Sequence, residues 1–279
     1  MVMHNLYPTL FVSHGAPTLA IQDGSAHRFL AGLGKAIGRP KAILVASAHW
    51  ESAGGSALSL VGSPATIHDF GGFPPELYEL QYPAPGAPVV AEQAARLLEQ
   101  AGFSVSRSTS RGLDHGAWVP LRLMYPMADI PVAQVALVQG AGPEVHYRLG
   151  AALQPLRAQG VLIVGSGSLT HNLYEVMGHR EDDAPPAWVT AFAGWIASTL
   201  QTARTDILLD YRKQAPYAVE NHPTEEHLLP LFVTLGAAGE DYAAERVHTS
   251  YTYGVLAMDA YSFRQVSVPS IANDGPAVP

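Results

Sequence analysis

The segment AILVASA at residues 42–48, followed directly by His49, decides the fold of this chain. An almost wholly apolar run of this length predicts a strand buried on both faces, as in a parallel sheet covered by helices. Other apolar runs predict strands at residues 10–13, 58–61, 132–138 and 161–165. Segments with helical spacing of apolar residues lie between them, at 26–37, 89–101, 117–124, 144–158 and 188–200. This alternation predicts an α/β fold, a single domain with a central, mainly parallel or mixed sheet flanked by helices.

The C-terminal part of the chain is expected to add one more helix and two short strands. Pro223 suits the first turn of a helix and predicts a helix over residues 224–235. Residues 247–251 and 255–260 are predicted as closing strands. The segment 266–279 is rich in Pro, Ser and Ala, and we expect it to be a frayed tail beside one domain that spans residues 1–265.

Composition excludes several classes of function. The formal net charge of -8 makes the chain a poor binder of the phosphate backbone, so we expect no nucleic-acid partner. The sequence holds 0 cysteines, which excludes disulfides, thiolate metal sites and cysteine nucleophiles. No window has the roughly 18 consecutive apolar residues of a membrane helix, and the first residues lack the pattern of a signal peptide. We therefore expect a soluble cytoplasmic protein without a membrane partner. Any transition metal would have to be bound by imidazole and carboxylate.

Three of the predicted strands run directly into polar loops: SHGAP at 13–17, HWE at 49–51 and GSGSLTHN at 165–172. Ligands of open α/β sheets bind beyond the carboxyl ends of the strands, so these loops are expected to meet at one edge. His14 lies in the first loop and His49 in the second. Taken alone, each histidine is more often a capping or packed residue than a metal ligand. Two of them at strand ends of one sheet make a shared site more credible.

Three further histidines have an informative context. His115 and His171 lie among small residues in loops, where imidazoles suit proton transfer near neutral pH, although either ring can equally serve as a structural hydrogen-bond donor. His227 follows Glu225 and Glu226 at the predicted helix start and can project toward the same cleft. The two glutamates are best explained as complementing the helix dipole. His222 is expected to pack or to form a hydrogen bond.

Six segments of this chain together resemble the class III extradiol ring-cleaving dioxygenases, close to the DOPA 4,5-dioxygenase branch. They are FVSHGAP at 11–17, ASAHWE at 46–51, HDFGGFPPELYELQYPAPG at 68–86, LDHGAWVPLRLMYP at 113–126, VGSGSLTHNL at 164–173 and HPTEEHLLPL at 222–231. They occur in order over most of the chain, which is far more specific than a single histidine motif.

The resemblance implies a mononuclear, non-haem Fe(II) site, with zinc expected in protein purified with that metal. Its ligands would be His14, His49 and His227, and His115 and His171 would be the acid–base pair around a catechol that is cleaved with O2. Within that pair we favour His171 as the base and His115 as the acid. A protocatechuate-type branch of the class uses two histidines and a glutamate, and Glu225 and Glu226 lie close enough to His227 to keep a carboxylate ligand open. Residues 1–265 would then form the catalytic domain.

Two alternatives use the same residues. Three histidines are also the ligand set that makes zinc-bound water nucleophilic, which would give a zinc-dependent hydrolase. A non-enzymatic binding member of the superfamily is the other alternative. A serine hydrolase is a weaker interpretation, since the sequence around Ser166 departs from G-x-S-x-G.

Overall fold

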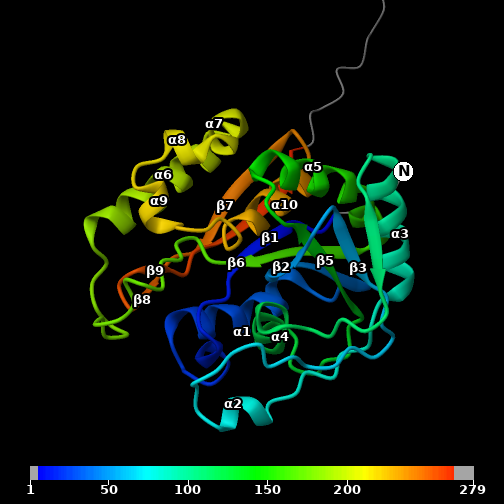
Figure 1. Ribbon diagram of the computed structural model, residues 1–279, viewed down its shortest axis with the longest axis horizontal. Coiled ribbons are helices and arrows are strands. Elements are labelled where there is room, and N and C mark those ends of the chain that lie inside the picture. The colour runs from blue at the N-terminus through cyan, green and yellow to red at the C-terminus, as the bar shows by residue number, and fades with distance from the viewer. Residues whose placement is uncertain (1–5, 267–279) are drawn as a thin grey trace, which may run out of the picture.

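The computed structural model describes residues 6–266, and these residues build one large sheet with helices on both faces (Figure 1). The strand order is β4-β3-β5-β2-β6-β1-β10-β7. The strands of this sheet are β1 (Thr9–Ser13), β2 (Ala42–Ser52), β3 (Ser56–Ser59), β4 (Val105–Ser108), β5 (Val132–Val138), β6 (Val161–Gly167), β7 (Tyr242–His248) and β10 (Ala260–Gln265). The central strands β5, β2, β6 and β1 are parallel, whereas β10 and β7 join antiparallel at one side. The sheet is therefore mixed around a parallel centre, and the predicted α/β class is confirmed.

The two faces of the sheet carry different helices. On one face lie α3 (Pro88–Gln100), α5 (Pro143–Leu153) and α10 (Leu229–Ala238), and on the other lie α1 (Ser25–Ile37) and α4 (His115–Met124) (Figure 1). Helix α6 (Ala187–Gln201) is also long. The shorter elements are the 3-10 turns Pro17–Ala20 and Gln154–Gln159, α2 (Glu76–Glu79), α7 (Thr205–Leu209), α8 (Tyr211–Gln214), α9 (Ala218–Asn221), and the hairpin of β8 (Tyr251–Thr252) with β9 (Leu256–Ala257). Within residues 6–266, no helix combines the length and the apolar character that crossing a membrane requires.

The first five residues of strand β2, Ala42 to Ala46, show why this run is apolar at every position. Its side chains alternate between the two layers of the core. Ala42, Leu44 and Ala46 pack with the cluster under α3, α5 and α10, and Ile43 and Val45 pack with the cluster under α1 and α4. Since both faces are covered by helices, neither set of side chains meets water.

Two expectations about the C-terminal part are wrong. Helix α10 begins at Leu229, with Pro230 in its first turn, and not behind Pro223. The turn that holds His227 is instead bound to the end of β6, because the Ser168 N–H donates to the His227 carbonyl (2.9 Å). The closing strands are also displaced. The predicted range 247–251 covers only the end of β7 and the start of β8, and the range 255–260 covers β9 and the first residue of β10. Strands β7 (Tyr242–His248) and β10 (Ala260–Gln265) complete the sheet.

Smaller differences concern strand and helix ends. Strand β2 extends through His49 to Ser52, so His49 belongs to the strand itself and lies next to a shift in its register. Ser166 and Gly167 still belong to β6, and the helix predicted over 144–158 ends at Leu153 and continues as a 3-10 turn. Strand β4 and helices α7, α8 and α9 were not predicted. The expected frayed tail lies, apart from Val266, outside the described residues.

Helices α5 and α10 cross in very close contact, and this makes a first prediction. A Cβ atom at Gly150 of α5 would collide with the Val233 carbonyl oxygen of α10. Gly150→Ala should therefore destabilise the protein by about 1–3 kcal/mol, because overpacking forces the two helices apart. Gly194 of α6 is the matched control, since a Cβ there meets nothing within 4 Å. Gly194→Ala should stabilise by about 0.5–1 kcal/mol. Urea unfolding measures the change in the free energy of unfolding for each variant. Equal changes in Gly150→Ala and Gly194→Ala would contradict the packing argument.

Candidate metal centre

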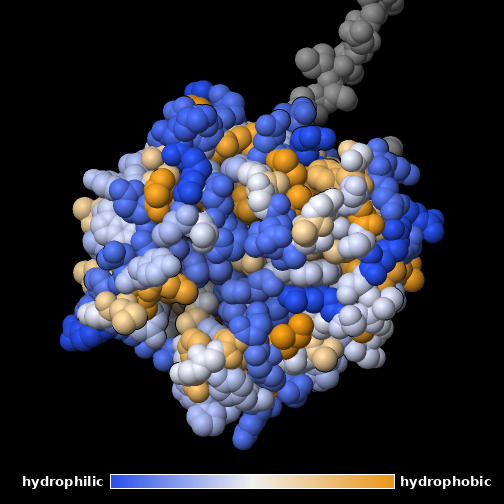
Figure 2. Space-filling view, in the orientation of Figure 1, coloured by the Kyte–Doolittle hydropathy of each residue, from blue (hydrophilic) through white to orange (hydrophobic). Residues whose placement is uncertain are grey.

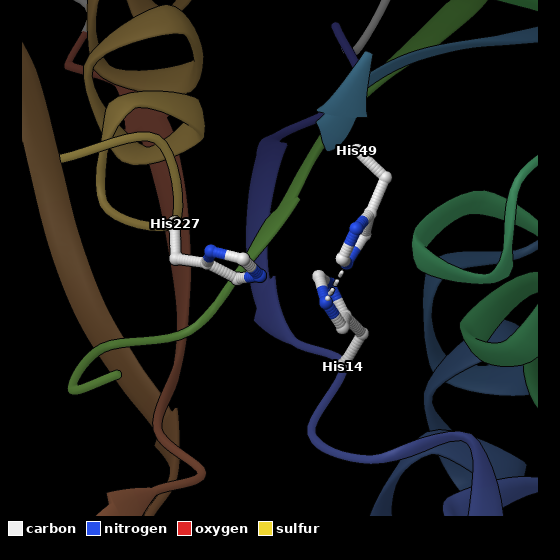
Figure 3. Close-up of side chains that lie close together, drawn as sticks. All are labelled: His14, His49 and His227. Carbon is white, nitrogen blue, oxygen red and sulfur yellow. Dashed lines mark hydrogen bonds between the residues drawn. The ribbon is translucent and has the colours of Figure 1, made fainter. Parts of the chain in front are cut away.

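Three imidazoles from distant parts of the chain converge at one edge of the sheet. Each of His14, His49 and His227 offers a ring nitrogen, and these nitrogens all lie within 4.8 Å of one another. Figure 3 shows the three rings pointing toward a common region, His14 and His49 from the strand side and His227 from the opposite side. The Nε2 atoms of His14 and His49 are 2.9 Å apart. The structure thus brings together the three residues that the resemblance implied as ligands.

The parallel centre of the sheet produces this convergence. Strand β6 lies between β1 and β2, so the carboxyl ends of all three strands reach the same edge. His14 follows β1, and its N–H donates to the Gly167 carbonyl of β6 (2.9 Å). Gly15 then turns the chain with a φ of +57°, in a place where a Cβ would meet the Met258 side chain at 2.7 Å. Only glycine combines that backbone angle with so little space.

Hydrogen bonds at Nδ1 fix the tautomers of two rings. The Ser166 hydroxyl donates its only proton to the Gly116 carbonyl, so its oxygen accepts the Nδ1–H of His14 (2.9 Å). The Nδ1–H of His227 donates to the Glu226 carboxylate (3.0 Å). In both rings the proton is on Nδ1, and Nε2 is left with a free lone pair. Partners of this kind orient metal-binding histidines in proteins.

The protonation state of the three rings also fits a metal. Burial, reinforced by the neighbouring imidazoles, lowers the pKa of His14 and His227 well below the usual value near 6.5. Burial likewise lowers the pKa of His49 to about 4. All three rings are therefore neutral at pH 7, which is the form that binds metals.

Nε2 of His227 gives the most direct indication of a missing partner. It is buried and has no hydrogen-bond partner among the described residues. A buried nitrogen lone pair without a partner is costly, and a bound cation removes that cost. Ligand nitrogens at about 2.0–2.1 Å from one ion lie roughly 3 Å apart, which agrees with the 2.9 Å between His14 and His49. The residues present therefore fit a divalent metal held by three imidazoles.

His115 and His171 lie on two sides of this cluster. His115 is the first residue of α4, and its ring centroid is 3.9 Å from that of His49. His171 lies in the loop after β6 and stacks on His227, with ring centroids 3.4 Å apart and an interplanar angle of 8°. Burial lowers the pKa of His171 to about 4. Both histidines therefore border the region toward which the three Nε2 atoms point.

A pocket of about 280 Å³ opens onto all five histidines. Its remaining wall is mainly apolar and includes Pro17, Phe70, Phe73, Leu173 and Leu256. The connection between β3 and α3 carries several aromatic residues, of which Phe70 and Phe73 line the pocket. Tyr82 of the same connection is buried, and its hydroxyl donates to the Tyr125 carbonyl (3.2 Å). On the face of the molecule in Figure 2, apolar residues form small groups separated by hydrophilic ones. The pocket has the mixture of an apolar wall and few convergent polar groups that small-molecule sites share.

Two aspartates at the site were missed by the sequence analysis. Asp69 accepts hydrogen bonds from both the backbone N–H (2.9 Å) and the ring Nδ1–H (3.0 Å) of His115. Asp114 is fully buried and caps α4 by accepting from the Ala117 N–H (3.1 Å). An Asp before a helix is a recognisable cap signal. No local pattern marks Asp69, whose partner is 46 residues away.

His222 is buried and forms a hydrogen bond, as expected. Its Nε2–H donates to the Leu169 carbonyl (2.8 Å), so His222 ties the turn before α10 to the loop after β6. Glu226, which the sequence left open as a ligand, accepts the Nδ1–H of His227 and the hydroxyl proton of Thr224. His4 lies outside the described residues.

Comparison with known proteins agrees with this geometry. The family described as the catalytic LigB subunit of aromatic ring-opening dioxygenase matches residues 8–263. A protein of Beta vulgaris named 4,5-DOPA dioxygenase extradiol is 44% identical over 263 residues, which is 93% of this chain and 97% of the relative. A protein of the same name from Escherichia coli (strain K12) is 38% identical, over 82% of this chain and 84% of the relative.

The fold has a solved counterpart as well. A crystal structure of an uncharacterized protein from Escherichia coli K12 superimposes with a TM-score of 0.77 and 31% sequence identity, and it covers 92% of this chain and 99% of that chain. Sequence and structure lead to the same assignment over nearly the whole length. The chain belongs to the LigB family of class III extradiol ring-cleaving dioxygenases.

Proposed function

We propose that this enzyme cleaves the ring of a catechol with O2 at a mononuclear Fe(II) site held by His14, His49 and His227. The observation that carries the proposal is the convergence of three ring nitrogens, one of which is buried and has no hydrogen-bond partner within residues 6–266. The names of the relatives, which are 4,5-DOPA dioxygenases of the extradiol type, support the catechol class.

Fe(II) bound on one side by three imidazoles would supply open positions for both catechol oxygens and O2. Because the three histidines are neutral, a catecholate dianion would balance the charge of the ion without a protein carboxylate. At nitrogen ligands the Irving–Williams order favours zinc over Fe(II), so purified protein would carry zinc unless iron is supplied.

Two histidines would move the protons of the reaction. His171 would accept a catechol proton, because it borders the pocket and its ring is held neutral by burial. His115 would act as the acid: it would take up a proton at Nε2 and deliver it to the substrate during ring opening, while the Asp69 carboxylate at its Nδ1 supplies a counter-charge for the ring that carries both protons. One carbon–carbon bond of the ring breaks and both atoms of O2 end in the product, so no external reductant is needed. The apolar wall of Phe70, Phe73 and Leu256 would hold the ring against the histidines.

The test is to load the metal-free protein with Fe(II) under anaerobic conditions and then to add O2 with catechols that carry different side chains. We expect oxygen uptake with a yellow semialdehyde product for at least one of them. Iron-loaded protein that consumes no O2 with any catechol would refute the proposal. Ester or amide hydrolysis by the zinc form without O2 would point to the hydrolase alternative, and full tolerance of replacing His115 and His171 would point to a binding protein.

Replacing His171 separates proton transfer from metal binding. His171→Ala should keep one metal per chain, because His171 is not part of the group formed by His14, His49 and His227 and its ring stacks on that of His227. Turnover should fall by about 10²–10⁴, which is the usual contribution of one acid–base group. Metal analysis and initial oxygen uptake on the same preparation check both parts. Unchanged turnover would remove His171 from the mechanism.

A further inference from the structure

The Asp69–His115 pair joins two parts of the chain that no sequence motif connects. Asp69 lies in the connection between β3 and α2, whereas His115 begins α4. A single carboxylate oxygen, Oδ1, accepts both the backbone N–H and the ring Nδ1–H of His115. The other oxygen, Oδ2, lies 3.9 Å from Nδ1 of His49. One side chain therefore restrains a residue of the pocket at its backbone and at its ring.

This double contact constrains the ring more than either bond alone. The first N–H groups of a helix have no partner within the helix, so Asp69 satisfies a donor that would otherwise be free. The second bond fixes the rotation of the imidazole about its side-chain torsions and leaves the proton on Nδ1. Nε2 makes no hydrogen bond to any residue in the described range, and the ring lines the pocket. It is the one ring nitrogen of His115 that can exchange a proton with a substrate.

The geometry of the pair shows which atoms donate. The backbone N–H of His115 can only donate, and the same Oδ1 atom of Asp69 lies within hydrogen-bond distance of this N–H and of the ring Nδ1, so Oδ1 is the acceptor for both. An ionised carboxylate can only accept, so it cannot share the Nδ1 position with a proton of its own. In this pair the Nδ1–H of His115 is therefore the donor and Oδ1 of Asp69 is the acceptor.

We propose that Asp69 is a positioning residue, which holds His115 in the Nδ1–H tautomer with Nε2 directed to the substrate pocket. The kinetic consequence rests on the proposed function, because it requires His115 to transfer a proton. The tautomer itself does not depend on that function. Asp69 acts through His115, so its effect should disappear when His115 is absent.

Two variants separate charge from geometry. Asp69→Asn can keep an oxygen at the Oδ1 position for both N–H groups, whereas Asp69→Ala removes the acceptor. Loss of an outer partner of an active-site histidine typically costs about 10–100-fold. We expect Asp69→Ala to lower kcat by that factor with little change in KM, and Asp69→Asn to recover most of the loss. Asp206→Ala, which removes an exposed partner of Arg204, is the matched control and should leave kcat unchanged.

The decisive measurements are a double-mutant cycle and a tautomer assay. In the His115→Gln background, Asp69→Ala should cause no further loss of kcat, since residues that act as a unit are not additive. An additive loss would overturn the proposal and leave Asp69 with a role in stability or metal binding. Metal content and the urea midpoint of each variant exclude loss of the ion or of the fold as the cause.

Nitrogen-15 NMR of histidine rings reads the tautomer without any turnover. The signal of His115, assigned by its loss in His115→Gln, should report an Nδ1–H imidazole in the zinc-loaded wild type and in Asp69→Asn. In Asp69→Ala it should shift to the Nε2–H form or to a mixture. An unchanged tautomer in Asp69→Ala would refute the inference. A wild type that shows the expected tautomer but no oxygen uptake would refute only the proposed function.

Discussion

Replacing His227 with alanine should abolish stoichiometric metal binding and, with it, oxygen uptake. Among the described residues, the variant removes the one buried Nε2 that has no hydrogen-bond partner, and it leaves only two of the three candidate ligands. Loss of an outer partner of a metal ligand already costs about 10–100-fold in affinity or activity, so loss of a ligand should cost more than ~100-fold. His49→Ala should behave in the same way. Elemental analysis after dialysis against limiting Fe(II) measures the occupancy.

Two control variants make this result specific. His179 pairs with Asp183 away from the cluster, and His179→Ala should retain full occupancy. A variant of Glu226 tests whether its carboxylate, rather than one of the three histidines, is a metal ligand. Its Oε1 accepts the Nδ1–H of His227, and Glu226→Gln can keep that acceptor, so the metal should stay bound. Full occupancy in His227→Ala together with an empty Glu226→Gln variant would identify the carboxylate as the ligand.

The second large effect concerns stability. Asp114 is fully buried and accepts from Ser47 Oγ (2.6 Å), Arg111 Nη2 (2.6 Å) and Gln134 Nε2 (2.7 Å). Asp114→Ala removes the carboxylate from the Arg111 guanidinium, which keeps the His49 carbonyl, and leaves the buried Gln134 amide without this acceptor. A buried polar group without its partner costs about 1–3 kcal/mol, and more for charged groups, so we expect the free energy of unfolding to fall by about 3 kcal/mol. Urea unfolding measures it.

The Asp114 network also reaches the candidate metal centre. Nη2 of Arg111 donates both to Asp114 Oδ2 (2.6 Å) and to the His49 carbonyl (3.1 Å). Through Arg111, the Asp114 carboxylate therefore stabilises the backbone of β2 at His49. Asp114→Asn, which keeps one acceptor oxygen, should lose less stability than Asp114→Ala. The exposed ion pair of Asp206 with Arg204 gives the reference, because removing it should cost no more than about 1 kcal/mol. A loss in Asp114→Ala as small as that of the reference would contradict the network.

The error over residues 224–235 shows where local signals fail. Pro223 and two glutamates satisfy every local criterion of a helix start, and Pro230 satisfies the same criterion seven residues later. Which of the two prolines begins the helix depends on contacts with another part of the chain. The Ser168 N–H binds the carbonyl of His227, and the His222 ring binds the carbonyl of Leu169. These bonds hold the segment as a turn, and that turn places the His227 ring opposite His14 and His49.

The sequence by itself determined the parallel centre of the sheet and the histidines at its edge. A run such as AILVASA can bury both faces only between two layers of helices, and a histidine after Ser13 leaves the strand where ligands collect. The family segments added the expected partners, His115, His171 and His227.

The tertiary structure alone decided which side chains support those histidines. Ser166 lies 152 residues from His14, and Asp69 lies 46 residues from His115, yet each pair is joined by a hydrogen bond of about 3 Å. Periodicity and capping report on neighbours within one or two turns of chain. A hydrogen bond between distant residues is fixed only when the strands pair in register, and so the proton positions on the rings follow from the fold.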